Sequence, residues 1–131
     1  METNRFYDLV ELLGRCLLAA LFLVDGWLII NNYQGGGDYL AQFGVPRLML
    51  APALLLHIVG GLLIVIGWQT RPTALALALF CIATAVIFHN KFDDPNEQIH
   101  FWKDLAIAGG FLVLLARGAG AYSLDARQRA A

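Results

Sequence analysis

The sequence carries little charge for its length. Asp, Glu, Lys and Arg make up 15% of its 131 residues, whereas soluble domains contain about 25%. Hydrophobic residues account for 59%, and the mean hydropathy is +0.63. The formal net charge of -1 provides no basic excess for nucleic acid. The composition therefore argues against an ordinary soluble domain and against nucleic acid as a partner, and it predicts an integral membrane protein.

Cysteine is also scarce. Cys16 and Cys81 lie far apart within apolar stretches and form no C-x-x-C pair, which excludes a readable dithiol motif or zinc knuckle. We interpret both as small buried hydrophobic residues. A basic segment typical of a cleavable signal is missing too, since Glu2, Asp8 and Glu11 flank the start of the first apolar stretch. We therefore expect the first helix to stay in the mature protein.

Four apolar stretches predict an all-α fold, an integral membrane four-helix bundle formed by one domain over residues 1–131. Each is roughly 17–22 residues long, which is enough to cross a hydrocarbon core of about 30 Å. The expected helices cover residues of about 9–30, 48–68, 72–89 and 95–116.

The connections between these stretches are polar. The first contains Gly35-Gly36-Gly37 and predicts a short interfacial helix over about 38–44, with Asp38 as N-cap and Gly44 just after its end. The last connection ends in Asp94-Pro95-Asn96-Glu97, which is typical of an N-cap followed by a first-turn proline and a capping-box glutamate.

Lys and Arg residues predict the orientation. Four spans place both termini on one side, and the side richer in Lys and Arg is usually cytoplasmic. The side of the termini has five such residues and the opposite side three: Arg5, Arg71, Arg117, Arg127 and Arg129 against Arg47, Lys91 and Lys103. We therefore predict cytoplasmic N and C termini.

Ionisable residues inside the apolar stretches require an explanation, because each costs about 2.5–3.5 kcal/mol at the centre of a membrane helix. Glu11 and Arg15 lie one turn apart, a spacing that predicts a structural ion pair. A role for this pair in a site is the alternative.

A second group of ionisable residues gathers in the outer half of the predicted bundle. Its members come from all four helices: Asp25, His57, His89, His100, Lys103 and Asp104. Glu97, His100, Asp104 and Ile107 recur at helical spacing and predict one inward-facing stripe. Two interpretations stay open, namely a polar network that fixes helix packing and a site that binds a ligand or handles protons.

Histidine changes charge near neutral pH, and beside a carboxylate it can exchange a proton with a quinone carbonyl or hydroxyl. An apolar helical pocket with a few polar groups suits a quinone headgroup. We assign proton handling to His57, His100 and Asp104, and supporting ligand contacts to Asp25, His89, Lys103 and Trp102. Haem or a metal is disfavoured, because His57 and His89 lie at different predicted depths and no histidine pair is spaced by one helical turn.

Several segments, in order along most of the chain, carry a family resemblance. They are Gly14 to Gly26, Tyr39 to Pro46 with its Gly-x-Pro ending, Gly60 to Pro72, Ala83 to His89, Asn96 to Asp104 and Gly118 to Asp125. Together they resemble the DoxX family of small four-helix membrane proteins. Members commonly carry a lysine after the first-helix glycine and a glutamate where His57 stands. This chain lacks both, and the resemblance implies that Asp25 and His57 replace them with reversed polarity.

The resemblance implies a bacterial cytoplasmic (inner) membrane protein in a redox setting, since founding members of the family are subunits of a quinone-linked sulfur oxidoreductase and many others have no known activity. Our first hypothesis is a subunit of such an oxidoreductase that binds quinone near the outer face and works with a redox partner or as a homo-oligomer. The second is a non-catalytic scaffold or assembly subunit. The third is a proton-coupled small-solute carrier, which would need an oligomer.

Overall fold

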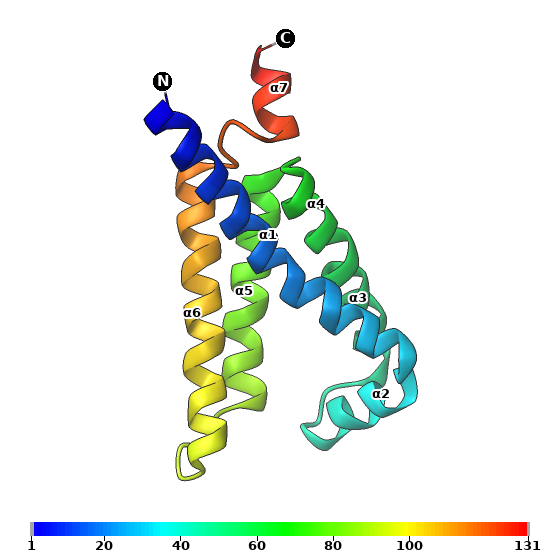
Figure 1. Cartoon of the computed structure of the whole chain (residues 1–131). Coiled ribbons are helices and arrows are strands. Elements are labelled where there is room, and N and C mark those ends of the chain that lie inside the picture. The colour runs from blue at the N-terminus through cyan, green and yellow to red at the C-terminus, as the bar shows by residue number, and fades with distance from the viewer. Residues whose placement is uncertain (1, 131) are drawn as a thin grey trace.

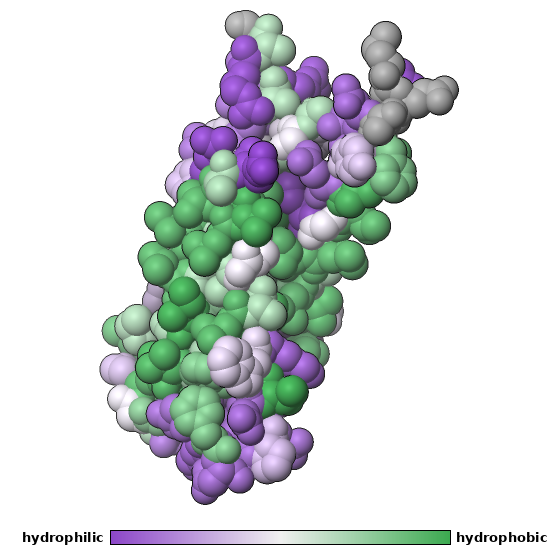
Figure 2. Space-filling view, turned by 90° about the vertical axis from the view of Figure 1, so that its left-hand side faces the viewer, coloured by the Kyte–Doolittle hydropathy of each residue, from purple (hydrophilic) through white to green (hydrophobic). Residues whose placement is uncertain are grey.

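The computed structural model describes residues 2–130, and within that range every regular element is a helix. Four helical segments are long and apolar enough to cross a membrane: Asn4–Asn31, Arg47–Ile66, Thr70–Phe88 and Pro95–Arg117. The predicted all-α membrane fold with four spans is therefore confirmed. Figure 2 shows the apolar belt between two polar ends that such a protein presents to lipid.

The spans form two pairs. Helix α5 (Thr70–Phe88) runs antiparallel to α6 (Pro95–Arg117) along its whole length, and α1 (Glu2–Asn31) crosses the bundle obliquely against the second span (Figure 1). Both described ends of the chain lie at the same end of the bundle, as four spans require. Which end faces the cytoplasm stays a prediction.

The second span is interrupted, which the sequence analysis did not predict. It consists of η1 (Arg47–Met49), α3 (Leu50–Leu55), a π-helical turn η2 (Leu56–Gly60) and α4 (Gly61–Ile66). A π turn holds one residue more than an α turn and is frequent at functional sites. Helix α1 packs closely on this turn at Gly26, where a side-chain Cβ would lie 2.5 Å from the Cδ1 atom of Ile58.

Two predicted boundaries were wrong. Helix α1 begins at Glu2 rather than near residue 9, because its polar first turns extend the helix beyond the apolar stretch. The short helix predicted over 38–44 is α2 (Tyr33–Gln42), whose N-cap is Asn32 rather than Asp38. The three glycines lie inside α2. At Gly36 the missing side chain allows close packing, because a Cβ there would lie 3.0 Å from a methyl group of Leu50.

Of the other residues predicted at helix ends, Gly44 and Asp94 have their predicted positions. Asp38 lies within α2 and forms an ion pair with Arg47. Gly44 follows the end of α2 in a left-handed conformation (φ +75°), as predicted. Asp94 caps α6 by accepting a hydrogen bond from the amide of Asn96, with Pro95 in the first turn.

The core lies between α1, α4, α5 and α6. Phe22, Ile64, Leu77 and Phe111 are fully or almost fully buried there, and alanines such as Ala78 let the helices approach. Without a hydrophobic force between helices in lipid, close packing of this kind holds a membrane bundle together.

The predicted ion pair between Glu11 and Arg15 is absent, and both residues lie in the described part of the chain. Arg15 is 2% exposed and donates from Nε to the carbonyl of Ile64 (2.9 Å) and from Nη2 to that of Val65 (2.8 Å). Carbonyls of the segment that follows α6, those of Ala119 and Tyr122, accept its other hydrogen bonds. The end of α4 presents carbonyls without helical partners and a negative dipole end, and these attract the guanidinium.

The segment after α6 is fastened to the same end of the bundle. Asp125, in α7 (Leu124–Ala130), accepts hydrogen bonds from the amides of Gln69 (2.9 Å) and Thr70 (3.0 Å), and its own amide donates to the carbonyl of Gly67 (2.9 Å). Burial raises the pKa of the Asp125 carboxyl, but the hydrogen bonds from Thr70 and Gln69 outweigh burial and hold that pKa below its ordinary value.

Gly67→Ala should destabilise the protein more than Gly44→Ala. Both glycines have positive φ values, +76° and +75°, so both alanines incur left-handed strain of about 1–2 kcal/mol. A Cβ at residue 67 would also lie 2.5 Å from Cβ of Ser123, whereas nothing lies within 4 Å at residue 44. Overpacking adds about 1–3 kcal/mol. Thermal unfolding in detergent measures the difference, and equal losses for the two variants would contradict the described packing.

Asp125→Asn should remove about 1 kcal/mol of stability at pH 7, because an amide offers one acceptor oxygen to two amide donors. The folded pKa of Asp125 is lowered, so its contribution is fully present above the unfolded pKa of about 4 and is lost as pH falls toward the folded value. Thermal unfolding at pH 7 and pH 3 should show the gap to the wild type closing at the lower pH. Asp93→Asn, in an exposed loop, is the matched control.

Candidate functional site

A cavity of about 580 Å³ opens at the end of the bundle away from the termini. It lies between α1, α2 and the second span on one side and α5 and α6 on the other. Its polar lining residues come from five elements or their ends: Asp25, Tyr39, His57, Thr84, His89, His100 and Asp104. Residues predicted to gather in the outer half of the bundle therefore surround a hollow space.

His57 forms the first polar contact of this cavity. Its Nε2 atom lies 2.9 Å from Oδ2 of Asp25, and its Nδ1 atom lies 2.6 Å from the carbonyl oxygen of Ala53. The ring packs between Phe22 and Phe80, with centroid distances of 5.2 and 5.1 Å. The predicted pairing of Asp25 with His57 is present, and the π-helical turn carries the histidine.

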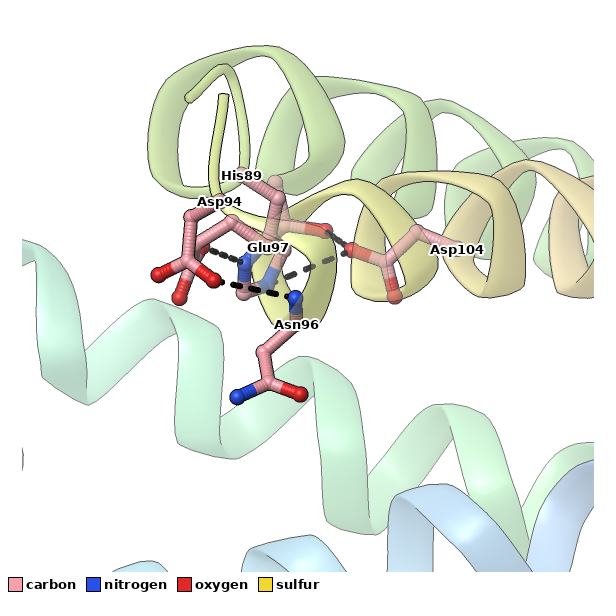
Figure 3. Close-up of polar contacts among 6 residues, drawn as sticks. His89, Asp94, Asn96, Glu97 and Asp104 are labelled. Atoms are coloured by element: carbon pink, nitrogen blue, oxygen red, sulfur yellow. Dashed lines mark hydrogen bonds and ion pairs between the residues drawn. The ribbon is translucent and has the colours of Figure 1, made fainter. Parts of the chain in front are cut away.

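His89, at the end of α5, forms the second polar contact. Its Nδ1 atom lies 2.9 Å from Oε2 of Glu97, and its Nε2 atom lies 3.9 Å from Oδ2 of Asp104. The hydroxyl of Thr84 lies 3.0 Å from the same Asp104 oxygen, to which it can donate, and 2.9 Å from the carbonyl oxygen of Cys81. Figure 3 shows His89 directed at the two carboxylates of α6, and the ring of His100 lies 5.3 Å from that of His89.

Aromatic residues connect α2 to the end of α5. The rings of Tyr39 and Phe88 are stacked at 5.3 Å, and Phe43 lies 5.2 Å from Tyr39 and 4.9 Å from Phe88. Burial raises the pKa of the Tyr39 phenol, and the charges of nearby carboxylates on α6 raise it further. Tyr39 therefore offers the cavity a neutral hydroxyl.

The structure separates the predicted site residues into two groups. Asp25, His57, His89, His100 and Asp104 line the cavity. Lys103 and Trp102, predicted as ligand contacts, are exposed and are not among the lining residues, with Trp102 57% exposed. Each residue advances about 100° around an α-helix, so the two point away from the face that carries Asp104.

Some lining residues were not predicted as site residues. Cys81, Thr84 and Phe88 share one face of α5 and line the cavity together. Their i, i+3 and i+7 spacing is a signal in the sequence, but one threonine and one cysteine in an apolar stretch do not attract attention by themselves.

A metal site requires ligands that converge. Among residues 2–130, no three His, Cys, Asp or Glu side chains are arranged to hold a metal ion. The absence of haem and metal stays a prediction.

The model of the DoxX family matches residues 10–90, which include most of α1, the π-helical turn and all of α5. The chain belongs to the DoxX family. The model of the SURF4 family matches residues 52–130 of this DoxX-family protein.

Two curated relatives extend the match to nearly the whole chain. Inner membrane protein YqjF of Escherichia coli K12 is 43% identical over 122 residues, which cover 93% of this chain and 94% of the relative. Inner membrane protein YphA of the same organism is 36% identical over 141 aligned positions, covering 97% and 100% of the two chains. No solved structure matches. With four membrane-crossing helices, this DoxX protein is a multi-pass protein of the bacterial inner membrane, as predicted.

Phe88→Ala should loosen α2. The change removes the aromatic contacts of Phe88 with Tyr39 and Phe43, each worth about 0.5–1.5 kcal/mol. Amide hydrogen exchange in α2 should become roughly tenfold faster. Phe101→Ala is the matched control, because its ring packs on Phe92 and Trp102 instead. Unchanged exchange in α2 would mean that the aromatic contacts do not hold this helix.

Proposed function

We propose that this DoxX-family protein binds a quinone or quinol headgroup in the cavity and acts as a membrane subunit beside a redox partner. The observation that carries the proposal is the placement of the polar groups. His57 pairs with Asp25, and His89 pairs with carboxylates of α6, but the two sets leave a space of about 580 Å³ between them instead of closing into one packed network. Small-molecule sites typically measure about 300–1,000 Å³ and combine apolar walls with a few polar groups.

The composition of the cavity supports an aromatic ring with oxygen substituents. Phe22, Phe80 and Phe88 provide flat apolar surfaces. The His57–Asp25 pair provides one set of hydrogen-bonding atoms. His89 and Asp104, which we call the His89–Asp104 group, provide a second, separate set. A quinone presents two carbonyl oxygens on a flat ring, and its quinol presents two hydroxyls, so such a ligand satisfies both sets.

The side chains have distinct roles in this proposal. His57 and Asp104 exchange protons with the ligand, and Thr84 positions Asp104 through its hydrogen bond. His100 assists from the cavity rim, where it is exposed beside His89. Interconversion of quinone and quinol also transfers two electrons, and these would pass to or from the redox partner.

Quinone binding can be measured on the purified protein in lipid nanodiscs by calorimetric titration with ubiquinone-1. His57→Gln and Asp104→Asn should each raise the Kd about tenfold, because each removes a hydrogen bond worth about 1.4 kcal/mol. Lys103→Gln and Trp102→Phe are matched controls, since these residues neighbour Asp104 on α6 but lie outside the cavity. Both controls should bind like the wild type.

The same variants test the scaffold hypothesis. If ubiquinone-1 does not bind the wild type, or binds the folded His57 and Asp104 variants equally well, the quinone proposal is wrong. A lower thermal stability of these variants without a change in binding would instead support a scaffold whose polar groups fix helix packing.

A further inference from the structure

The contacts of His57 constrain the protons that its ring carries. Both ring nitrogens lie within hydrogen-bonding distance of an oxygen: Nδ1 at 2.6 Å from the carbonyl of Ala53, and Nε2 at 2.9 Å from Oδ2 of Asp25. A neutral imidazole carries a hydrogen on only one of its nitrogens. The two contacts therefore cannot both be hydrogen bonds donated by a neutral ring.

The main-chain carbonyl decides which nitrogen carries the first hydrogen. A carbonyl oxygen can only accept, so Nδ1 must donate to Ala53. Nε2 then has two options that make its 2.9 Å contact favourable. Either Nε2 also carries a hydrogen and the ring is an imidazolium beside the Asp25 carboxylate, or Nε2 is bare and accepts a hydrogen from a protonated Asp25. A bare Nε2 facing an ionised carboxylate would place two lone pairs against each other.

We infer that the His57–Asp25 pair carries one additional proton, compared with a neutral imidazole beside an ionised carboxylate, and that this proton faces the cavity. Both permitted arrangements have zero net charge. A neutral pair is what a low-dielectric membrane interior favours, because an isolated charge there is costly.

The surroundings of His57 fix this arrangement. His57 is 5% exposed, and its ring is held between Phe22 and Phe80, which limits rotation. The Asp25 side chain is 52% exposed and lines the cavity. The π-helical turn places His57 so that Nδ1 reaches the carbonyl one turn earlier in the chain while Nε2 reaches across to α1. The other titratable groups around the cavity are Tyr39 on α2, Cys81 on α5, His89, and His100 and Asp104 on α6.

His89 is not constrained in the same way. Its Nδ1 atom can donate to Glu97 at 2.9 Å, but its Nε2 atom is 3.9 Å from Asp104, beyond hydrogen-bonding distance. A neutral His89 with a bare Nε2 therefore satisfies its contacts. The cavity is thus asymmetric: the His57–Asp25 pair offers a proton, and the His89–Asp104 group has room to accept one.

The role of this asymmetry rests on the proposed function, because the asymmetry would direct protons to and from a bound quinone. When the redox partner supplies two electrons to a bound quinone, the ring takes up two protons. One is the stored proton, which moves from the His57–Asp25 pair to one ring oxygen, and the other reaches the second ring oxygen from solvent. The pair then has a charge of -1 until another proton replaces the one it gave. The protonation itself is a property of the protein without ligand, so the two proposals can fail separately.

Nitrogen NMR of ¹⁵N-histidine-labelled protein in nanodiscs, without quinone at pH 7, tests the inference. The His57 signals are assigned by their loss in His57→Gln. We expect either an imidazolium, with a hydrogen on both nitrogens, or a neutral Nδ1–H ring together with an infrared band of a protonated carboxyl that disappears in Asp25→Asn. A neutral Nε2–H ring, or a neutral Nδ1–H ring without that infrared band, would overturn the inference.

Asp25→Asn provides a second measurement on a near-isosteric variant. Its side-chain amide can donate to a bare Nε2, so His57 should become a neutral Nδ1–H ring without any change in the His89 signals. Asp38→Asn, on α2 and paired with Arg47, is the control and should leave His57 unchanged. An imidazolium that persists in Asp25→Asn would contradict sharing of the proton between the two residues.

Titration with ubiquinone-1 then separates the proposals, because a shared proton in a protein that does not bind quinone overturns only the proposed function.

Discussion

A polar group in hydrocarbon must find its partner inside the protein, and the rest of this structure depends on that constraint. Arg15 shows it most clearly. Arg15 is 2% exposed and, among the residues that the structure describes, has no carboxylate within ion-pair distance, yet four main-chain carbonyls accept its hydrogen bonds. Those carbonyls belong to α4 and to the segment after α6. The hydrogen bonds of one α1 side chain therefore connect the first span to the second span and to the last part of the chain.

The two ends of the bundle meet the constraint differently. At the end that holds the termini, Arg15 and Asp125 pair with main-chain atoms, and the segment after α6 is held closely against them. At the other end, His57 and His89 pair with carboxylates around a space that stays open. Main-chain partners thus close the first end, whereas side-chain pairs border the open cavity at the second end, where we propose that a ligand binds.

Much of this architecture could be predicted from the sequence, because hydropathy over a window of about 20 residues determines where a chain crosses a membrane. The spans, the Asp94 cap and the inward stripe through His100 and Asp104 were all predicted. The helical position of the α2 glycines was not predicted, because glycine indicates a loop unless the residue packed against it is known, here Leu50 for Gly36. Arg15 was paired with the nearest carboxylate along the chain, since its true partners are main-chain carbonyls distant in sequence. Lys103 and Trp102 were placed in the site by proximity along the chain instead of by helix face.

The π-helical turn has a consequence for how sequences of this family compare. One additional residue in a helix rotates every later side chain by about 100° relative to an uninterrupted helix. Because of the turn, the helix face on which Ile64 packs into the core is not fixed by the helix face that carries His57. Removing a single residue between Leu56 and Gly60 would let the helix continue without the π turn and would keep the two faces in place, because the lost residue and the lost wide turn cancel. A relative without the turn should thus show a one-residue gap at this place in an alignment, with its core-facing residues on either side still in register.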